Sequence, residues 1–167
     1  MAGVAVAVVL ALAARPVWET LAFAWWAGFA VALVFVDVAV RRLPDRLTYP
    51  AAAGTLALLG AAALVEHQGH AWVRAALAAV GLALVFAALT LVLGRRGPGL
   101  GDAKLMLATM PVLGWLGWPA VVDGLLLGLT AQGVVAVALL VSGRRHVRLP
   151  MGLFLVTGTL AAIALLG

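Results

Sequence analysis

Residues 20–40, TLAFAWWAGFAVALVFVDVAV, are apolar over almost their whole length and carry a single charged side chain, Asp37. A helix needs about 20 consecutive apolar residues to cross the hydrocarbon core of a bilayer. Backbone polar groups cannot remain unsatisfied in lipid, so such a segment crosses as a helix. The stretch therefore predicts a membrane-spanning helix with one carboxyl group in its last turn.

The rest of the chain repeats this pattern, because apolar runs alternate with short segments rich in charge, glycine or proline. Of the 167 residues, 66% are hydrophobic and 10% are charged, whereas a typical soluble domain has about 25% charged residues. This composition excludes a soluble globule and a disordered chain. We expect one all-α membrane domain, residues 1–167, with six to seven spans. The further predicted helical segments are residues 2–14, 49–65, 71–93, 103–116, 119–142 and 149–167.

Residues 2–14 are shorter than a spanning helix, and two interpretations remain open. The segment is either a seventh crossing or a cleaved signal peptide, although it lacks the positively charged start that such signals carry. In both cases the other six helices keep their orientation.

The basic residues indicate the orientation of the chain in the membrane. Nine of the eleven lie in or beside three segments that follow the second, fourth and sixth predicted helices. By the positive-inside rule these segments face the cytoplasm. The net charge of +5 is thus a topology signal, and we expect no nucleic-acid binding. The nine residues are Arg41, Arg42, Arg46, Arg95, Arg96, Lys104, Arg144, Arg145 and Arg148.

Two acidic residues, Asp37 and Asp102, lie at the cytoplasmic boundary predicted by this topology. Two neighbouring carboxyl groups cannot both ionise readily, so they share a proton. The ionised group then takes a proton from water, and the protonated group polarises a peptide carbonyl. Asp102 begins a helix, where the helix dipole favours the anion. We therefore expect Asp37, at the end of its helix, to hold the proton more readily.

Other interpretations of the two acids remain open. Asp37 has the spacing for a local ion pair with Arg41, and Asp102 has the position of a helix cap. Acids inside a membrane also serve as ion relays in small ion-coupled transporters or in non-catalytic membrane subunits. A relay has acids at several depths or at the midplane. Two acids at one interface favour hydrolysis.

The surroundings of the two acids carry a family resemblance. Asp37 is followed by Leu43-Pro44-Asp45 and Leu47-Thr48, and the second acid lies in Gly99-Leu100-Gly101-Asp102-Ala103-Lys104. Together these stretches resemble the type IV prepilin peptidases, the GxGD-type aspartic proteases of bacterial membranes. A weaker match is LPMGLFLVTG, residues 149–158.

The resemblance implies that Asp37 and Asp102 are the catalytic pair. It also implies that the chain removes the short basic leader of prepilin or pseudopilin substrates at the cytoplasmic face of the bacterial inner membrane. The two motif glycines are expected to allow tight backbone geometry beside the acid. Asp45 is expected to be a turn or cap residue, and Lys104 to tune the pair or contact lipid. The motif-supporting residues are Arg42, Leu43, Pro44, Asp45, Thr48, Gly99, Gly101 and Lys104.

The chain has no cysteine. Full-length members of the family carry an N-terminal segment with paired CxxC motifs and methylate the new N-terminus of the substrate. We therefore expect peptidase activity without methyl transfer, with no cofactor and no metal. The expected partners are the substrate and membrane lipids, and the sequence leaves the oligomeric state open.

Overall fold

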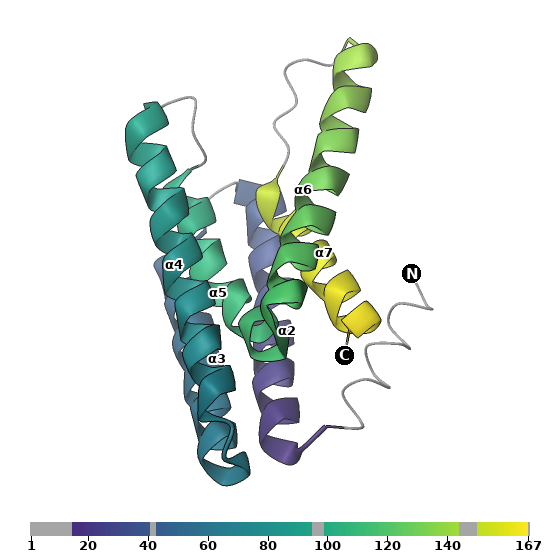
Figure 1. The fold of residues 1–167 in the computed structure, drawn as a ribbon. Coiled ribbons are helices and arrows are strands. Elements are labelled where there is room, and N and C mark those ends of the chain that lie inside the picture. The colour runs from purple at the N-terminus through teal and green to yellow at the C-terminus, as the bar shows by residue number, and fades with distance from the viewer. Residues whose placement is uncertain (1–14, 41–42, 95–98, 144–149, 167) are drawn as a thin grey trace.

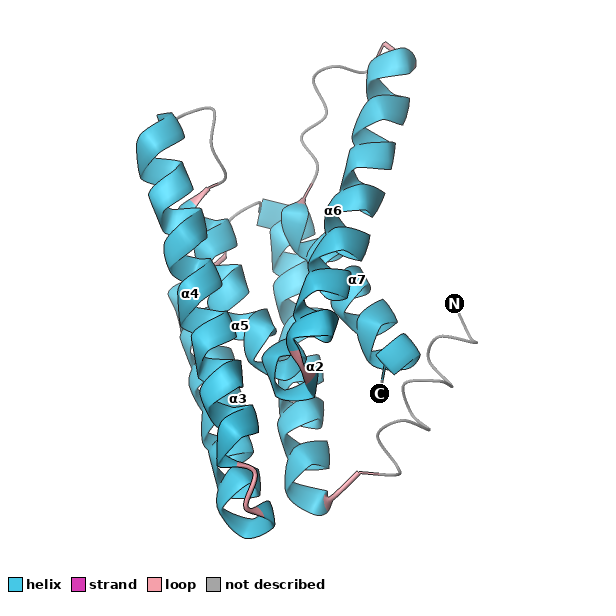
Figure 2. Cartoon of the chain, in the orientation of Figure 1, coloured by secondary structure: helices cyan, strands magenta, loops and turns pink. Residues whose placement is uncertain are grey.

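A computed structural model describes residues 15–40, 43–94, 99–143 and 150–166, and these residues form six helices and no strand (Figures 1 and 2). The predicted all-α fold is confirmed, and each observed helix overlaps one predicted segment. Residues 2–14 lie outside the described residues, so their role stays a prediction. The helices are α2 (Val17–Val40), α3 (Asp45–Glu66), α4 (Gly69–Leu93), α5 (Leu100–Leu116), α6 (Trp118–Val141) and α7 (Met151–Leu166).

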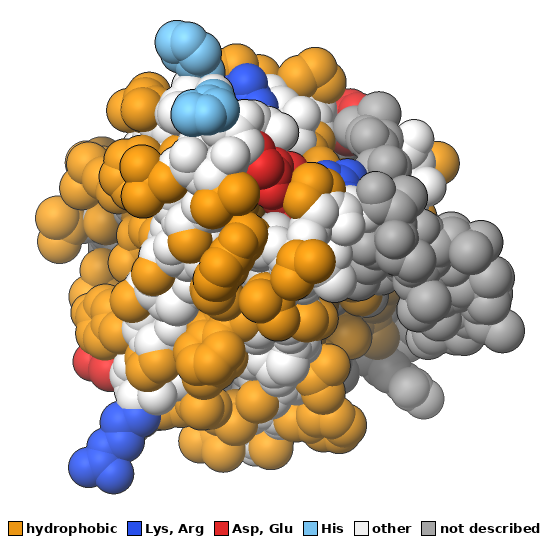
Figure 3. Space-filling model, turned by 90° about the horizontal axis from the view of Figure 1, so that it is seen from below, with side chains coloured by type: hydrophobic (Ala, Val, Ile, Leu, Met, Phe, Trp, Pro, Cys, Tyr) orange, Lys and Arg blue, Asp and Glu red, His pale blue; other side chains and the backbone are white. Residues whose placement is uncertain are grey.

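Four of these helices, α2, α3, α4 and α6, are long and apolar enough to cross a membrane, judged by length and composition. The other two are shorter, with 17 residues in α5 and 16 in α7. Large hydrophobic side chains are exposed along the sides of the bundle, most of them on α2, α4 and α6, and Figure 3 shows such side chains around much of the edge of the bundle in a view of one end. In water such a surface would drive association, whereas in a bilayer it faces lipid.

Helix α5 is the centre of the bundle, because it packs against each of the other five described helices. Its closest neighbour is α4, and Gly114 allows that approach. A Cβ atom at Gly114 would lie only 2.7 Å from the Cα atom of Ala75 in α4. Most α5 side chains are buried among the other helices. Helix α5, which begins at the GxGD motif, is therefore surrounded by the other described helices.

Helices α6 and α7 form a second close pair (Figure 1). Gly158 of α7 faces Gly124 and Gly128 of α6, and a Cβ atom at Gly158 would lie 2.5 Å from the Gly124 carbonyl oxygen and from the Gly128 nitrogen. Small residues let helix backbones approach in this way. The contact fixes where α7 lies and thus where its N-terminus points.

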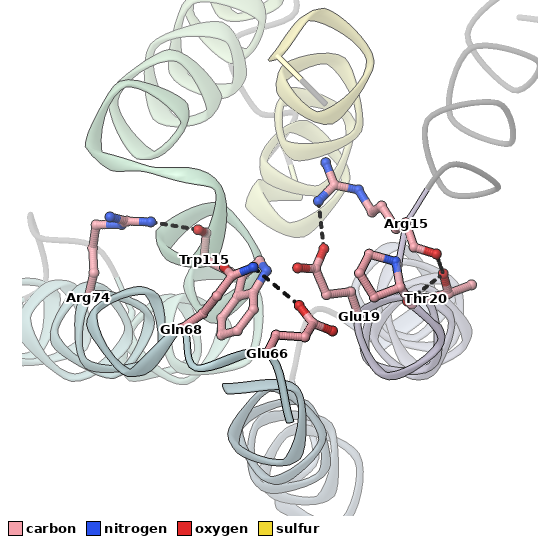
Figure 4. Close-up of polar contacts among 8 residues, drawn as sticks. Arg15, Glu19, Thr20, Glu66, Gln68, Arg74 and Trp115 are labelled. Carbon is pink, nitrogen blue, oxygen red and sulfur yellow. Dashed lines mark hydrogen bonds and ion pairs between the residues drawn. The ribbon is translucent and has the colours of Figure 1, made fainter. Parts of the chain in front are cut away.

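The end of the bundle that holds the start of α2 contains a separate set of polar contacts (Figure 4). Arg74 of α4 donates from Nε to the Gly114 carbonyl and from Nη2 to the Trp115 carbonyl, both at 2.7 Å. The last carbonyls of a helix have no partner within it, and here a guanidinium satisfies two of them. Arg15 forms an ion pair with Glu19 at 3.0 Å. Arg15 and Arg74 are the two basic residues outside the basic segments, and each has a partner within the bundle.

Candidate active site

Asp37 lies in the last turn of α2 and is 9% exposed. Its Oδ2 atom accepts a hydrogen bond of 2.8 Å from the backbone N–H of Gly152, the second residue of α7. The first N–H groups of a helix have no acceptor within the helix. The carboxylate therefore satisfies one of them, and a buried contact joins two segments 115 residues apart.

Gly152 is the residue that sequence reasoning missed. A Cβ atom there would lie 2.7 Å from Asp37 Oδ2 and 3.2 Å from Asp37 Cγ, so a side chain would displace the carboxyl group. The only sequence signal was the weaker match at residues 149–158, which contains Gly152 without singling it out.

Asp102 lies in the first turn of α5, three residues after Gly99. The Gly99 N–H donates to Asp102 Oδ2 at 2.9 Å, and the Asp102 N–H donates to the Gly99 carbonyl at 2.9 Å. Gly99 is the N-cap of α5 and has no side chain, so only the half of a capping box that the N3 side chain supplies is present. Asp102 is therefore not the N-cap that the alternative interpretation expected; it is the third residue of α5, and one of its carboxylate oxygens accepts from the N–H of the N-cap residue.

The fold brings the two acids together. Asp37 lies in the last turn of α2 and Asp102 in the first turn of α5, and these two helices pack against each other, so both acids lie at the same end of the bundle. The expectation that Asp37 holds the shared proton considered only the position of each acid in its own helix, at the end of α2 for Asp37 and at the start of α5 for Asp102. In the structure Asp37 also lies at the N-terminus of α7, so both acids accept a hydrogen bond at the start of a helix. The positions of the acids at helix ends therefore do not indicate which of the two is protonated, and the expectation that Asp37 holds the proton stays a prediction.

The two motifs also meet through Asp45 and Lys104, whose side chains form an ion pair. The expectation that Asp45 caps a turn is wrong, because Pro44 is the N-cap of α3 and no side chain caps that end. Asp45 is instead the first residue of α3, and its carboxylate accepts from Lys104 Nζ. The Lys104 ammonium also lies 5.9 Å from the centre of the Tyr49 ring.

The remaining motif residues have structural roles. Leu43 packs beside Gly101, and the buried Thr48 donates from Oγ1 to the Pro44 carbonyl at 3.2 Å. The expectation that Gly99 and Gly101 allow tight backbone geometry stays a prediction, and in this conformation neither glycine is crowded. A Cβ atom would meet nothing closer than 3.8 Å at Gly99 and 3.6 Å at Gly101, which is ordinary contact. Arg42 lies outside the described residues.

The chemistry available at this site is that of two carboxyl groups and two backbone N–H donors. Among the described residues no group of three or more His, Cys, Asp or Glu side chains is arranged to hold a metal ion. A pair of close carboxyl groups suits proton transfer to and from water and a polar substrate bond.

The fold and the site define an all-α membrane protein with two acidic residues, Asp37 and Asp102, at one end of its helix bundle. The profile of the type IV leader peptidase family matches residues 21–166, and the chain belongs to this family. The chain is similar to the "Prepilin leader peptidase/N-methyltransferase" of Aeromonas salmonicida (strain A449), with 35% identity over 147 residues. It is also similar to the protein of that name in Aeromonas hydrophila, with 34% identity over 147 residues.

Each of these alignments covers 86% of this chain and 48% of the relative. The chain therefore spans about half the length of the curated relatives it matches. No solved structure matches the chain significantly.

Proposed function

We propose that this protein is a membrane-embedded aspartic endopeptidase that removes the leader of type IV prepilin-like proteins at the cytoplasmic face of the inner membrane. The observation that carries the proposal is that Asp37 and Asp102 lie at the same end of the bundle, in the last turn of α2 and the first turn of α5, two helices that pack against each other. Family membership supports the peptidase reaction, and the names of the relatives support the substrate class.

In the proposed mechanism the ionised carboxylate takes a proton from water while the water oxygen bonds to the carbonyl carbon of the scissile peptide. The protonated carboxyl gives its proton to the carbonyl oxygen. When the tetrahedral intermediate collapses, the carbon–nitrogen bond breaks and the leaving nitrogen takes the proton that the first carboxyl had received. The second carboxylate recovers its proton from the hydroxyl of the intermediate. The pair thus returns to its starting state.

The proposed cytoplasmic location rests on charge. Arg46 follows Asp37 by nine residues and Lys104 follows Asp102 by two, and both belong to the basic segments that the positive-inside rule assigns to the cytoplasm. Water and a charged leader are available at such an interface, whereas neither enters the hydrocarbon core at low cost.

The proposal is tested by expressing the chain together with a prepilin and following leader removal by mass spectrometry. Asp37→Asn and Asp102→Asn should each lower processing by about 10²–10⁴-fold, the contribution typical of a general acid or base. Asp123→Asn is the matched control. Asp123 lies in the second turn of α6, which begins where α5 ends, whereas Asp102 lies where α5 begins, so the control acid is far along the bundle from the candidate site. Normal processing by either variant of the pair would refute the dyad.

The same spectra report on methyl transfer, since the mass of the mature substrate shows whether its new N-terminus carries a methyl group. Failure to process any prepilin would contradict the substrate assignment.

A further inference from the structure

The buried hydrogen bond between Gly152 and Asp37 gives α7 a direct role at the candidate site. We infer that Gly152 is a positioning residue, whose backbone N–H fixes Asp37 Oδ2 and so sets the direction in which the other oxygen of the carboxyl group, Oδ1, faces the reacting groups. This inference rests on the proposed peptidase function.

A backbone N–H near a helix start suits this task better than a side chain would. Its direction is set by the helix, and it has no competing acceptor within α7. A donor that bonds a carboxylate forms a stronger hydrogen bond than one between neutral groups. Both Gly152 and Asp37 are buried, so water does not compete for the contact.

The donor is also held firmly in place. Helix α7 lies against α6 through Gly158 and Gly128, and a Cβ atom at Gly128 would lie 2.9 Å from the Phe154 carbonyl oxygen. This close packing begins one turn after Gly152. A shift of α7 along α6 would have to break these close backbone contacts at several points. The packing therefore restrains the position of the Gly152 N–H relative to the bundle.

The steric surroundings of Gly152 make the inference testable. The three atoms nearest to a Cβ at this position all belong to Asp37, at 2.7 Å for Oδ2, 3.2 Å for Cγ and 3.3 Å for Cβ. Gly152→Ala therefore acts on the Asp37 carboxyl group before it acts on any other part of the protein.

The first test compares Gly152→Ala with Gly133→Ala in the full chain, using purified protein and a prepilin substrate. Gly133 is the matched control, because it is an exposed helical glycine of α6 and a Cβ atom at this position would meet nothing within 4 Å. We expect Gly152→Ala to lower kcat by about 10²-fold, the effect of misplacing a catalytic group by about 1 Å. KM should change little, and Gly133→Ala should resemble the wild type.

A pH–rate profile separates positioning from a merely structural role. Loss of a hydrogen bond to the carboxylate disfavours its ionised form. A limb of the Gly152→Ala profile should therefore move to higher pH, whereas fewer folded molecules would only lower the height of the profile. Unchanged kcat, or a lower profile of unchanged shape, would overturn the inference.

The second test does not depend on activity. Thermal unfolding in detergent is measured for Gly152→Ala, Asp37→Ala and the double variant. Because the colliding Oδ2 and Cγ atoms are absent from Asp37→Ala, the loss of Tm caused by Gly152→Ala should largely disappear in that background. An equal loss of Tm in both backgrounds contradicts the contact. A wild type that processes no prepilin contradicts the proposed function instead, and the coupling in this cycle then decides whether Gly152 holds Asp37.

Discussion

The Lys104 ammonium of α5 donates a hydrogen bond to the Asp45 carboxylate at the start of α3, so the two sequence motifs are joined by an ion pair. The partners are 59 residues apart in the chain, and each lies close in sequence to one member of the acidic pair. The ion pair therefore ties the segment that follows Asp37 to the turn that carries Asp102.

Exchanging the two charges tests this ion pair. The side chains are 32% exposed for Lys104 and 56% exposed for Asp45, and exposed ion pairs contribute little to stability. We expect Asp45→Ala and Lys104→Ala to leave Tm close to that of the wild type and to lower processing by less than the variants of the acidic pair. The double exchange Asp45→Lys with Lys104→Asp should process better than either single exchange. Equal processing by all three would show that the contact has no role.

Alanine at the two motif glycines gives a second prediction. Gly99 has φ −76° and ψ 159°, a conformation open to any residue, and a Cβ atom has room at both Gly99 and Gly101. We expect Gly99→Ala and Gly101→Ala to fold normally and to keep most of their processing activity. Gly152→Ala, measured beside them, should lose far more. Complete loss of processing by well-folded Gly99→Ala or Gly101→Ala would mean that catalysis requires a conformation other than this one.

The close packing of α6 on α7 gives a third prediction. A Cβ atom at Gly158 would lie 2.5 Å from backbone atoms of α6, so Gly158→Ala forces the two helices apart. Overpacking of this kind typically costs about 1–3 kcal/mol. Tm should fall for Gly158→Ala and stay level or rise for Gly133→Ala, as measured by thermal unfolding in detergent. Processing should fall with the displacement of α7, because α7 carries the donor to Asp37.

Hydropathy and helix-boundary signals sufficed to predict the six described helices. A transmembrane helix has a required length, and Asp45, Gly99 and Pro150 stand near the ends of the apolar runs. The motifs around Asp37 and Asp102 also singled out two acids that lie on adjacent helices at the same end of the bundle. Both predictions depend on patterns that are local in the sequence.

The contacts that shape the site are not local, which is why the sequence did not reveal them. The bond from Gly152 to Asp37 uses a backbone N–H that every residue except proline has, so it leaves no mark in the residue types. The prediction that Asp45 is a turn or cap residue was wrong for a similar reason. It relied on the local turn chemistry of Pro44-Asp45, whereas the partner of the Asp45 carboxylate, Lys104, lies 59 residues away in the chain. Helix ends did not distinguish the two acids, because α7 contributes a second helix start to Asp37.

Arg74 gives a fourth prediction, at the end of the bundle away from the acids. It donates two hydrogen bonds of 2.7 Å to the last carbonyls of α5, and lysine cannot reproduce this forked geometry. Loss of hydrogen bonds from a charged group costs about 1.5–3 kcal/mol. We expect Arg74→Ala and Arg74→Lys to lower Tm, and Arg46→Ala, which removes an exposed arginine, to leave it nearly unchanged. A normal Tm for Arg74→Ala would show that water replaces the guanidinium without cost.

The shared proton of the acidic pair gives the last prediction, a bell-shaped dependence of processing rate on pH. At low pH both carboxyl groups are protonated and neither accepts a proton from water. At high pH both carboxyl groups are ionised, and neither holds a proton that it could give to the carbonyl oxygen. Because the two acids act as a coupled pair in the proposed mechanism, the two limbs describe the pair and not one residue each. The profile is measured with purified protein and a prepilin, with folding followed at each pH. A rate that rises with pH to a plateau and shows no alkaline limb, in a protein that stays folded, would mean that a single carboxylate acts as base and that the second acid does not serve as proton donor.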